Sequence, residues 1–250
     1  MRRPELLGMR VDRTSYPEAV AQILGWARSG ESRYVCCAPV CSAVLSSESP
    51  EYRRVMNEAD LVTPDGMPLV WWLRLSGHRE ATRVYGPDLT LHLLAAAAQE
   101  RLPVGFYGSD CGTLERLAAN ATARFQGLWI AYTYAPPFRD LTTEEDALVC
   151  EQIRSSGTRL LFVGLGAPKQ ERWMAAHRSL IPAVMIGVGA AFDFLAGTKP
   201  QAPGWMQRAG LEWLFRLVTE PRRLGPRYLR QNPKFLALLA LEGLGLRPRT

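Results

Sequence analysis

Short apolar runs alternate with stretches of helical periodicity along most of this chain. The runs that predict strands cover residues 34–37, 61–63, 82–85, 104–107, 129–133, 160–163 and 183–188. The first expected helix begins at Ser15-Tyr16-Pro17-Glu18, and others cover residues 67–75, 89–100, 113–125, 143–154 and 169–178. Strands that alternate with helices form βαβ units. The sequence therefore predicts a Rossmann-like α/β fold, in which a mainly parallel sheet is covered by helices on both faces.

The pattern changes near Lys199. An amphipathic helix is expected over residues 205–219, because Trp205, Ala209, Trp213 and Leu217 recur every fourth position before Pro221. A basic segment (222–230) and an apolar stretch (235–246) follow. We expect an α/β domain of residues 1–198 and a basic helical appendage of residues 199–250. The helix should dock on the domain, whereas the segment after Pro221 is open to docking or to a place in a membrane interface.

Composition and charge limit the kinds of protein that this chain can be. The 250 residues are 47% hydrophobic and 22% charged, as in a globular protein. No apolar run reaches the roughly 18 residues of a membrane-spanning helix, and the N-terminal apolar part is too short for a signal peptide, so a cytosolic protein is expected. The net charge is +6, and the appendage holds ten Lys or Arg against three Glu. A basic tail indicates phosphate, nucleic acid or an anionic membrane surface as a partner.

The cysteines and histidines indicate no metal site. The odd set Cys36, Cys37, Cys41, Cys111 and Cys150 has no CxxC spacing and is typical of reduced thiols in a core. The three histidines are far apart in the sequence, in no ligand spacing. Walker A, GxSxG and HExxH patterns and Asp-x-Asp pairs are absent. We therefore expect neither a metal nor a resident cofactor.

The segment Thr63-Pro64-Asp65-Gly66-Met67-Pro68 places a carboxylate at a turn between an expected strand and an expected helix. In α/β proteins such turns are where ligands bind. Pro64 and Gly66 fix the backbone, so the Asp65 carboxylate can be aimed at a substrate and take the proton of an attacking hydroxyl. Taken alone, this segment favours an Asx-turn or a helix cap as the role of Asp65, and the other motifs of the chain reverse that preference.

Two further turns can hold phosphate. In Arg83-Val84-Tyr85-Gly86-Pro87-Asp88, the arginine can neutralise a leaving group, although a surface pair with Asp88, itself a natural cap, is equally open. In Phe106-Tyr107-Gly108-Ser109, a strand runs into a small-residue turn whose N–H groups can hold phosphate oxygens.

Two glycine-rich segments come later. In Gly164-Leu165-Gly166-Ala167-Pro168-Lys169-Gln170-Glu171, the glycines allow close approach of a ligand, and Gln170 and Glu171 can bind sugar hydroxyls or simply cap a helix. Gly187-Val188-Gly189-Ala190-Ala191-Phe192-Asp193 approaches a dinucleotide fingerprint, but Phe192 replaces its third glycine, which argues against a nicotinamide or flavin site.

Together these segments resemble the WecG/TagA/CpsF glycosyltransferases over about residues 6–229. The matching pieces are Ala59 to Pro68, Arg83 to Asp88, Gly164 to Glu171, Gly187 to Asp193, Ala202-Pro203 through Trp213, and Glu220-Pro221-Arg222-Arg223. Each piece is weak alone, but six in this order are specific.

The resemblance implies an inverting, metal-independent transferase. It would move a hexose, an N-acetylhexosamine or its uronic acid from a UDP-sugar to a polyprenyl-diphosphate-linked glycan for cell-envelope or exopolysaccharide synthesis. It implies that Asp65 is the base and that residues 199–250 bring arginines to the active site and the enzyme to the inner face of the plasma membrane. The expected substrate-binding residues are Thr63, Arg83, Asp88, Gly108, Gly166, Lys169, Gln170, Glu171, Gly189, Asp193, Arg222, Arg223 and Arg227. A homo-oligomer is allowed, and nucleic acid is not an expected partner.

One departure from the family pattern affects function. Ala38-Pro39 stands where the family usually has Thr-Asn, and Cys41 stands where a histidine is common. Proline offers neither a side-chain hydrogen bond nor a backbone donor. A non-catalytic nucleotide-sugar-binding subunit is therefore the main alternative, ahead of a nucleotide-dependent oxidoreductase and a nucleic-acid-binding protein.

Overall fold

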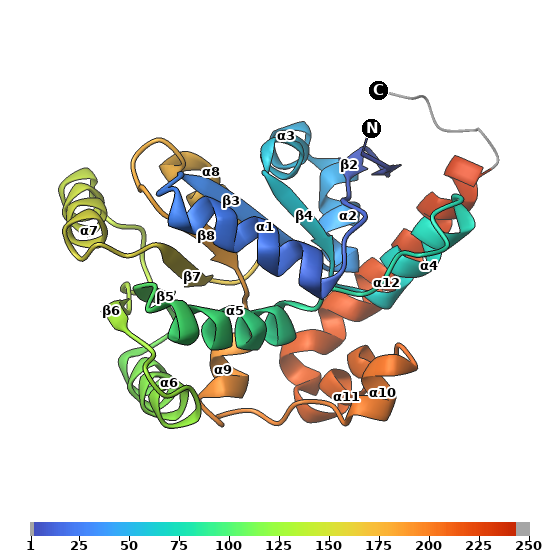
Figure 1. The fold of residues 1–250 in the computed structure, drawn as a ribbon. Helices are drawn as coiled ribbons and strands as arrows, with labels where there is room; N and C mark the ends of the chain where they lie inside the picture. Colours follow the sequence, from blue (N-terminus) through green and yellow to red (C-terminus); the bar gives the residue numbers. More distant parts are fainter. Residues whose placement is uncertain (1–2, 244–250) are drawn as a thin grey trace.

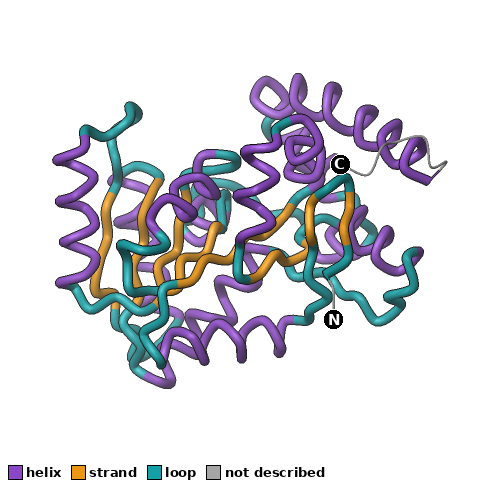
Figure 2. The backbone as a smooth tube through the Cα atoms, turned by 90° about the horizontal axis from the view of Figure 1, so that it is seen from above, coloured by secondary structure: helices purple, strands orange, loops and turns teal. Residues whose placement is uncertain are grey.

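A six-stranded parallel sheet forms the centre of the computed structural model, which describes residues 3–243 (Figures 1 and 2). The spatial order is β4-β3-β8-β7-β5-β6. The strands are β3 (Arg33–Ala38), β4 (Leu61–Pro64), β5 (Val104–Gly108), β6 (Ile130–Tyr134), β7 (Leu160–Gly164) and β8 (Val184–Gly187). A short antiparallel hairpin of β1 (Glu5–Leu6) and β2 (Met9–Arg10) precedes them. The predicted α/β fold with a mainly parallel sheet is confirmed.

Helices cover both faces of the sheet, as the strand pattern requires. Alternate residues of β3 point into the hydrophobic cores on opposite faces of the sheet. Val35 and Cys37 pack on one face, and Tyr34, Cys36 and Ala38 pack on the other. The first face is covered by α1 (Tyr16–Arg28), α5 (Gly86–Glu100), α6 (Cys111–Arg124) and α9 (Ala191–Leu195). The second is covered by α2 (Val40–Glu48), α3 (Pro50–Glu58), α7 (Thr143–Ser155) and α8 (Lys169–His177), with α4 (Met67–Leu75) beside β4.

Two expectations about local structure are wrong. Residues 82–85 form no strand; instead the Val84 N–H donates to the Pro64 carbonyl at 3.1 Å, and the segment leads directly into α5. Helices α2 and α3, which lie between β3 and β4, were not predicted. Pro39 occupies the N-cap position of α2, and the Ser49 side chain caps α3 ahead of Pro50.

The appendage consists of three helices rather than one long helix and a tail. They are α10 (Gly204–Arg208), α11 (Glu212–Thr219) and α12 (Pro221–Gly243). The predicted helix over residues 205–219 is broken at Gly210, whose φ of 72° is left-handed. Helix α12 packs against α2 of the domain. It includes the predicted apolar stretch up to residue 243, and residues 244–246 of that stretch lie outside the described residues. Within the described range, no helix is both long enough and apolar enough to cross a membrane.

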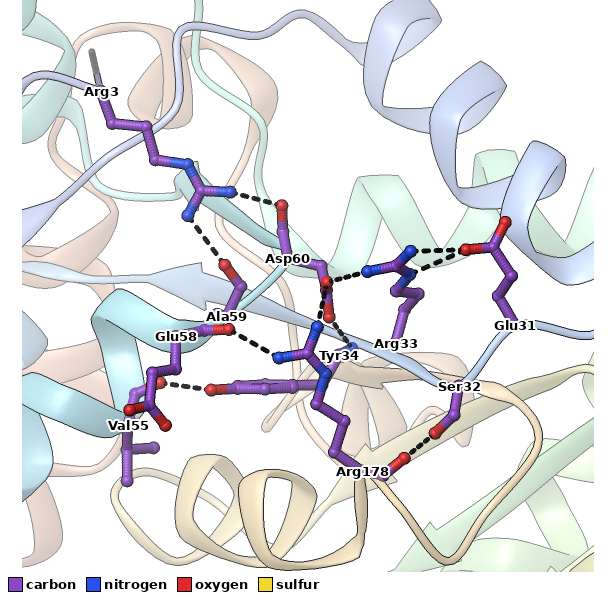
Figure 3. Close-up of polar contacts among 10 residues, drawn as sticks. All are labelled: Arg3, Glu31, Ser32, Arg33, Tyr34, Val55, Glu58, Ala59, Asp60 and Arg178. Carbon is purple, nitrogen blue, oxygen red and sulfur yellow. Dashed lines mark hydrogen bonds and ion pairs between the residues drawn. The ribbon is translucent and has the colours of Figure 1, made fainter.

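A charged cluster closes the edge of the sheet at which the strands begin (Figure 3). The side chain of Asp60, only 7% exposed, accepts from Arg33 at 2.8 Å and from Arg178 at 2.6 Å. Its second oxygen accepts the Tyr34 N–H at 3.0 Å, and Arg3 donates to its carbonyl. One carboxylate thus joins β3, the loop before β4 and the end of α8.

Replacing Asp60 should destabilise the fold without removing activity. In Asp60→Ala, two arginines each lose a buried partner and a backbone N–H loses its acceptor, so we expect a loss of about 3 kcal/mol in unfolding free energy, measurable by urea denaturation. The matched control is Glu31→Gln, because Glu31 is a more exposed partner of Arg33 and should cost less than about 1 kcal/mol. Equal losses in the two variants would contradict this role of Asp60.

Candidate active site

A cavity of about 280 Å³ opens at the carboxyl ends of four neighbouring strands. Its walls come from the loops after β4, β3, β8 and β7, which are adjacent in the sheet, and from α11 and α12 above them. Among the lining residues are Cys37, Pro39, Asp65, Tyr85, Gln170, Asp193, Phe194, Arg216, Arg223 and Arg227. This is the edge of a parallel sheet at which α/β proteins bind ligands.

Asp65 sits in the wall of this cavity with a fixed carboxylate. Its backbone N–H donates to the Ala38 carbonyl at 3.2 Å, and its Oδ2 accepts the Gly86 N–H at 2.8 Å. Burial raises the pKa of Asp65 from 3.8 to about 6; Arg83 opposes the shift and Glu212 adds to it. Asp65 therefore has the position and the basicity of a general base near neutral pH.

Arg83 joins Asp65 to the appendage. Its guanidinium donates to the Asp65 carbonyl, lies 3.8 Å from the Asp65 carboxylate and donates to Glu212 on α11 at 2.6 Å. The Tyr85 hydroxyl donates to the other Glu212 oxygen at 2.8 Å, and the Arg83 guanidinium stacks 4.0 Å from the Tyr85 ring. Docking of α11 and placement of the Asp65 turn thus depend on the same buried contacts.

Gln170 shapes the opposite wall. Its Oε1 accepts the N–H of Gly166 at 3.2 Å and of Gly189 at 3.1 Å, so one side chain joins the loops after β7 and β8. Both glycines have positive φ, 77° and 50°, which other residues adopt only with strain. Asp193 continues the wall and pairs with Lys199 at 2.7 Å.

Three arginines of the appendage face the cavity. Arg223 pairs with Glu220 at 2.6 Å, and Arg227 donates to the Cys41 sulfur. Arg216 lies over the Phe194 ring, and its buried Nε–H has no hydrogen-bond partner among the residues that the structure describes. A buried guanidinium N–H is costly to leave unpaired, so this donor is suited to bind an anionic group that enters the cavity.

The other sequence-predicted residues lie outside the cavity lining. Thr63 is buried and donates to the Val84 carbonyl, and Gly108 packs against Gly164. Asp88 accepts from the Tyr16 hydroxyl, and Lys169 is exposed and pairs with Asp140. Glu171 is 1% exposed beneath the site, and Arg222 is exposed on α12. The cavity therefore gathers seven of the fourteen named residues: Asp65, Gly166, Gln170, Gly189, Asp193, Arg223 and Arg227.

A larger hollow, of about 610 Å³, lies at the opposite edge of the sheet. Arg3, Arg33 and Asp60 are in its walls, and all three are paired within the protein. The smaller cavity is the better candidate because it combines an aimed carboxylate with an unpartnered guanidinium donor.

Sequence reasoning missed Arg216 and Glu212. They are one helical turn apart on α11, so they project from neighbouring positions of one helix face. With Thr219 they form the polar face of this amphipathic helix, and the apolar pattern alone gave no reason to expect that this face is the one that meets the domain.

The structure is that of an α/β protein whose cavity combines the Asp65 carboxylate with three arginines from α11 and α12. A model of the WecG/TagA/CpsF glycosyl transferase family matches residues 4–249 of the chain. The chain belongs to this family of glycosyltransferases, as its motifs predicted.

Two relatives are named N-acetylglucosaminyldiphosphoundecaprenol N-acetyl-beta-D-mannosaminyltransferase. The one from Bacillus subtilis (strain 168) is 31% identical over 192 residues, which are 72% of this chain and 73% of the relative. The one from Bacillus spizizenii (strain ATCC 23059 / NRRL B-14472 / W23) is 32% identical over 203 residues, which are 80% of this chain and 76% of the relative.

Proposed function

We propose that the protein transfers a hexose, an N-acetylhexosamine or its uronic acid from a UDP-sugar to a polyprenyl-diphosphate-linked glycan. The observation that carries this proposal is one cavity that holds the Asp65 carboxylate together with Arg216, Arg223 and Arg227. The names of the two Bacillus relatives make N-acetylmannosamine the first donor sugar to test and an N-acetylglucosaminyl-diphosphate lipid the first acceptor.

The proposed reaction is a single displacement with inversion. Asp65 removes the proton of the acceptor hydroxyl while its oxygen attacks the anomeric carbon of the donor. The bond to the diphosphate breaks on the opposite side and UDP leaves. Arginines, rather than a divalent metal, neutralise the charge that develops on the diphosphate. Adding Mg²⁺ or Mn²⁺ should then leave the initial rate unchanged.

The test is UDP release across a panel of nucleotide-sugars, with a short-chain diphosphate-lipid that carries N-acetylglucosamine. We expect turnover that requires the acceptor, and an inverted anomeric centre in the product. The main alternative is a subunit that binds a nucleotide-sugar without turnover. Pro39 favours that alternative, because it lines the cavity where the family usually supplies a hydrogen-bonding side chain. Tight UDP-sugar binding with no transfer to any acceptor would establish the alternative.

We also propose that residues 199–250 form the membrane-associating part of a peripheral enzyme in the cytoplasm. Large apolar side chains are exposed along α10–α12: Trp205, Trp213, Leu214, Val218, Leu229, Leu236 and Leu241. The same helices carry most of the excess positive charge, which attracts anionic lipids.

Exposed leucine on α12 should contribute directly to membrane binding. Leu229 is 78% exposed, and burying a leucine in lipid is worth about 1.5–3 kcal/mol, so Leu229→Asp should weaken binding to anionic vesicles at least about tenfold. Phe138→Asp is the matched control, because Phe138 is even more exposed, at 98%, but belongs to the α/β domain. Cosedimentation with vesicles measures both. Equal loss in the two variants would contradict the proposed membrane face.

A further inference from the structure

A second cluster of reactive side chains lies away from the cavity, between α7 and α8. Asp146 and Cys150 are one turn apart on α7, and His177 ends α8. One ligand atom from each of the three lies within 4.8 Å of the other two. Gln170, which lines the cavity, is at the start of α8, so the cluster is about 10 Å further along that helix.

Each ring nitrogen of His177 faces a hydrogen-bond acceptor. Its Nδ1 lies 2.7 Å from the Trp173 carbonyl oxygen, and its Nε2 lies 2.8 Å from Oδ2 of Asp146. Both neighbours are acceptors, whereas a neutral imidazole has a single N–H. If Nδ1–H donates to the carbonyl, the Nε2 lone pair faces a carboxylate unless the ring is doubly protonated or a cation lies between the two groups.

The surroundings hold the ring in the orientation of a metal ligand. His177 stacks on Trp173 with centroids 4.2 Å apart, and Trp173 stacks on Tyr107 at 4.3 Å. A histidine that donates one ring N–H to a backbone carbonyl presents its other nitrogen to a metal, which is the common arrangement in metal sites.

The remaining two groups complete the donor set. The Cys150 side chain is buried and is hydrogen-bonded to no described group, while the Asp146 side chain is 34% exposed and leaves a path from solvent. One nitrogen, one sulfur and one carboxylate oxygen match zinc, which takes four ligands in a tetrahedron. A zinc ion with a thiolate, a carboxylate and a neutral imidazole is also electrically balanced.

We propose that Asp146, Cys150 and His177 bind one zinc ion, with water as the fourth ligand, and thereby fasten α7 to α8. Zinc–ligand bonds of about 2.0 Å at a tetrahedral angle separate nitrogen from oxygen by roughly 3.3 Å. The Asp146 carboxylate therefore retreats slightly on binding, and the Cys150 thiol releases its proton to solvent. The competing arrangement is a doubly protonated His177 paired with Asp146, which leaves Cys150 without a role.

Cobalt is the direct probe, because Co²⁺ takes the same ligands and absorbs light. Chelator-treated full-length protein, titrated with Co²⁺, should show thiolate charge-transfer and tetrahedral d–d bands that saturate at one equivalent, and Zn²⁺ should abolish them. Cys150→Ser should lose the charge-transfer band, and His177→Gln should weaken Zn²⁺ binding at least about tenfold. Cys111→Ser is the control and should keep both signals, because Cys111 is an exposed thiol on α6.

A second measurement needs no variant. Saturating Zn²⁺ should slow alkylation of Cys150 in the wild-type protein, as followed by peptide mass spectrometry, and should raise its unfolding temperature. The proposal is overturned if wild-type protein gives no thiolate–cobalt band, if the band persists in Cys150→Ser, or if Zn²⁺ leaves the alkylation rate of Cys150 unchanged.

Discussion

Asp65→Asn should lower turnover by ~10²–10⁴-fold, because an amide cannot accept the proton of the acceptor hydroxyl. The same variant should keep its affinity for UDP, since the arginines that we propose to bind the diphosphate are unchanged. Isothermal titration with UDP and initial rates of transfer separate the two effects. A rate within tenfold of wild type would remove Asp65 from the mechanism.

The stability of this variant provides an independent check. The pKa of Asp65 is about 6 in the folded protein, against an ordinary value of 3.8 that we take for the unfolded chain. At every pH above about 6, the ionised Asp65 therefore lowers the free energy of unfolding. That loss is absent below the ordinary pKa, where both states are protonated. Asp65→Asn should therefore unfold at an equal or higher temperature than wild type at pH 7. A clear drop would instead mark Asp65 as a structural residue.

Arg216→Met should lower kcat/KM by ~10²–10³-fold, which is the usual effect of removing one preorganised donor from a site where negative charge develops. The affinity for UDP should fall as well, because the Nε–H of Arg216 is buried in the cavity wall with no described protein partner. Steady-state kinetics and UDP titration measure both quantities.

Arg222→Met is the discriminating comparison. Arg222 belongs to the same basic segment and matches the family motif, but it is exposed and lies outside the cavity lining. We expect a change of no more than about twofold, as for other surface substitutions. If Arg222→Met were the more damaging variant, the motif rather than the geometry of the cavity would identify the functional arginines.

The sheet and most of its helices were predictable because the apolar runs are short, regular and separated by clear caps. The elements that were predicted wrongly or not at all have physical causes. Residues 82–85 have the composition of a strand but bond to the Asp65 turn instead of joining the sheet. Helix α2 follows a proline, and the sequence alone does not show whether a proline ends one element or starts the next.

The site was predictable in part. Turns after parallel strands lie at one edge of a sheet, so Asp65, Gly166 and Gly189 could be placed at that edge from the strand pattern alone. The sequence did not show that Gln170 joins two loops, that Glu171 lies beneath them, or that Arg216 enters the cavity. Those placements depend on how α8 and α11 pack. The Asp146, Cys150 and His177 cluster was invisible for the same reason, since α7 and α8 meet only in the folded chain.

The pH dependence of kcat/KM tests most directly whether Asp65 is the base. Because burial raises the pKa of Asp65 to about 6, lowering the pH through that value protonates the group and removes its ability to accept a proton. We expect kcat/KM of the wild-type enzyme to be level above about pH 7 and to fall by about tenfold per pH unit below 6, and we expect no such fall in Asp65→Asn. A flat wild-type profile across this range, or the same acidic limb in the variant, would contradict it.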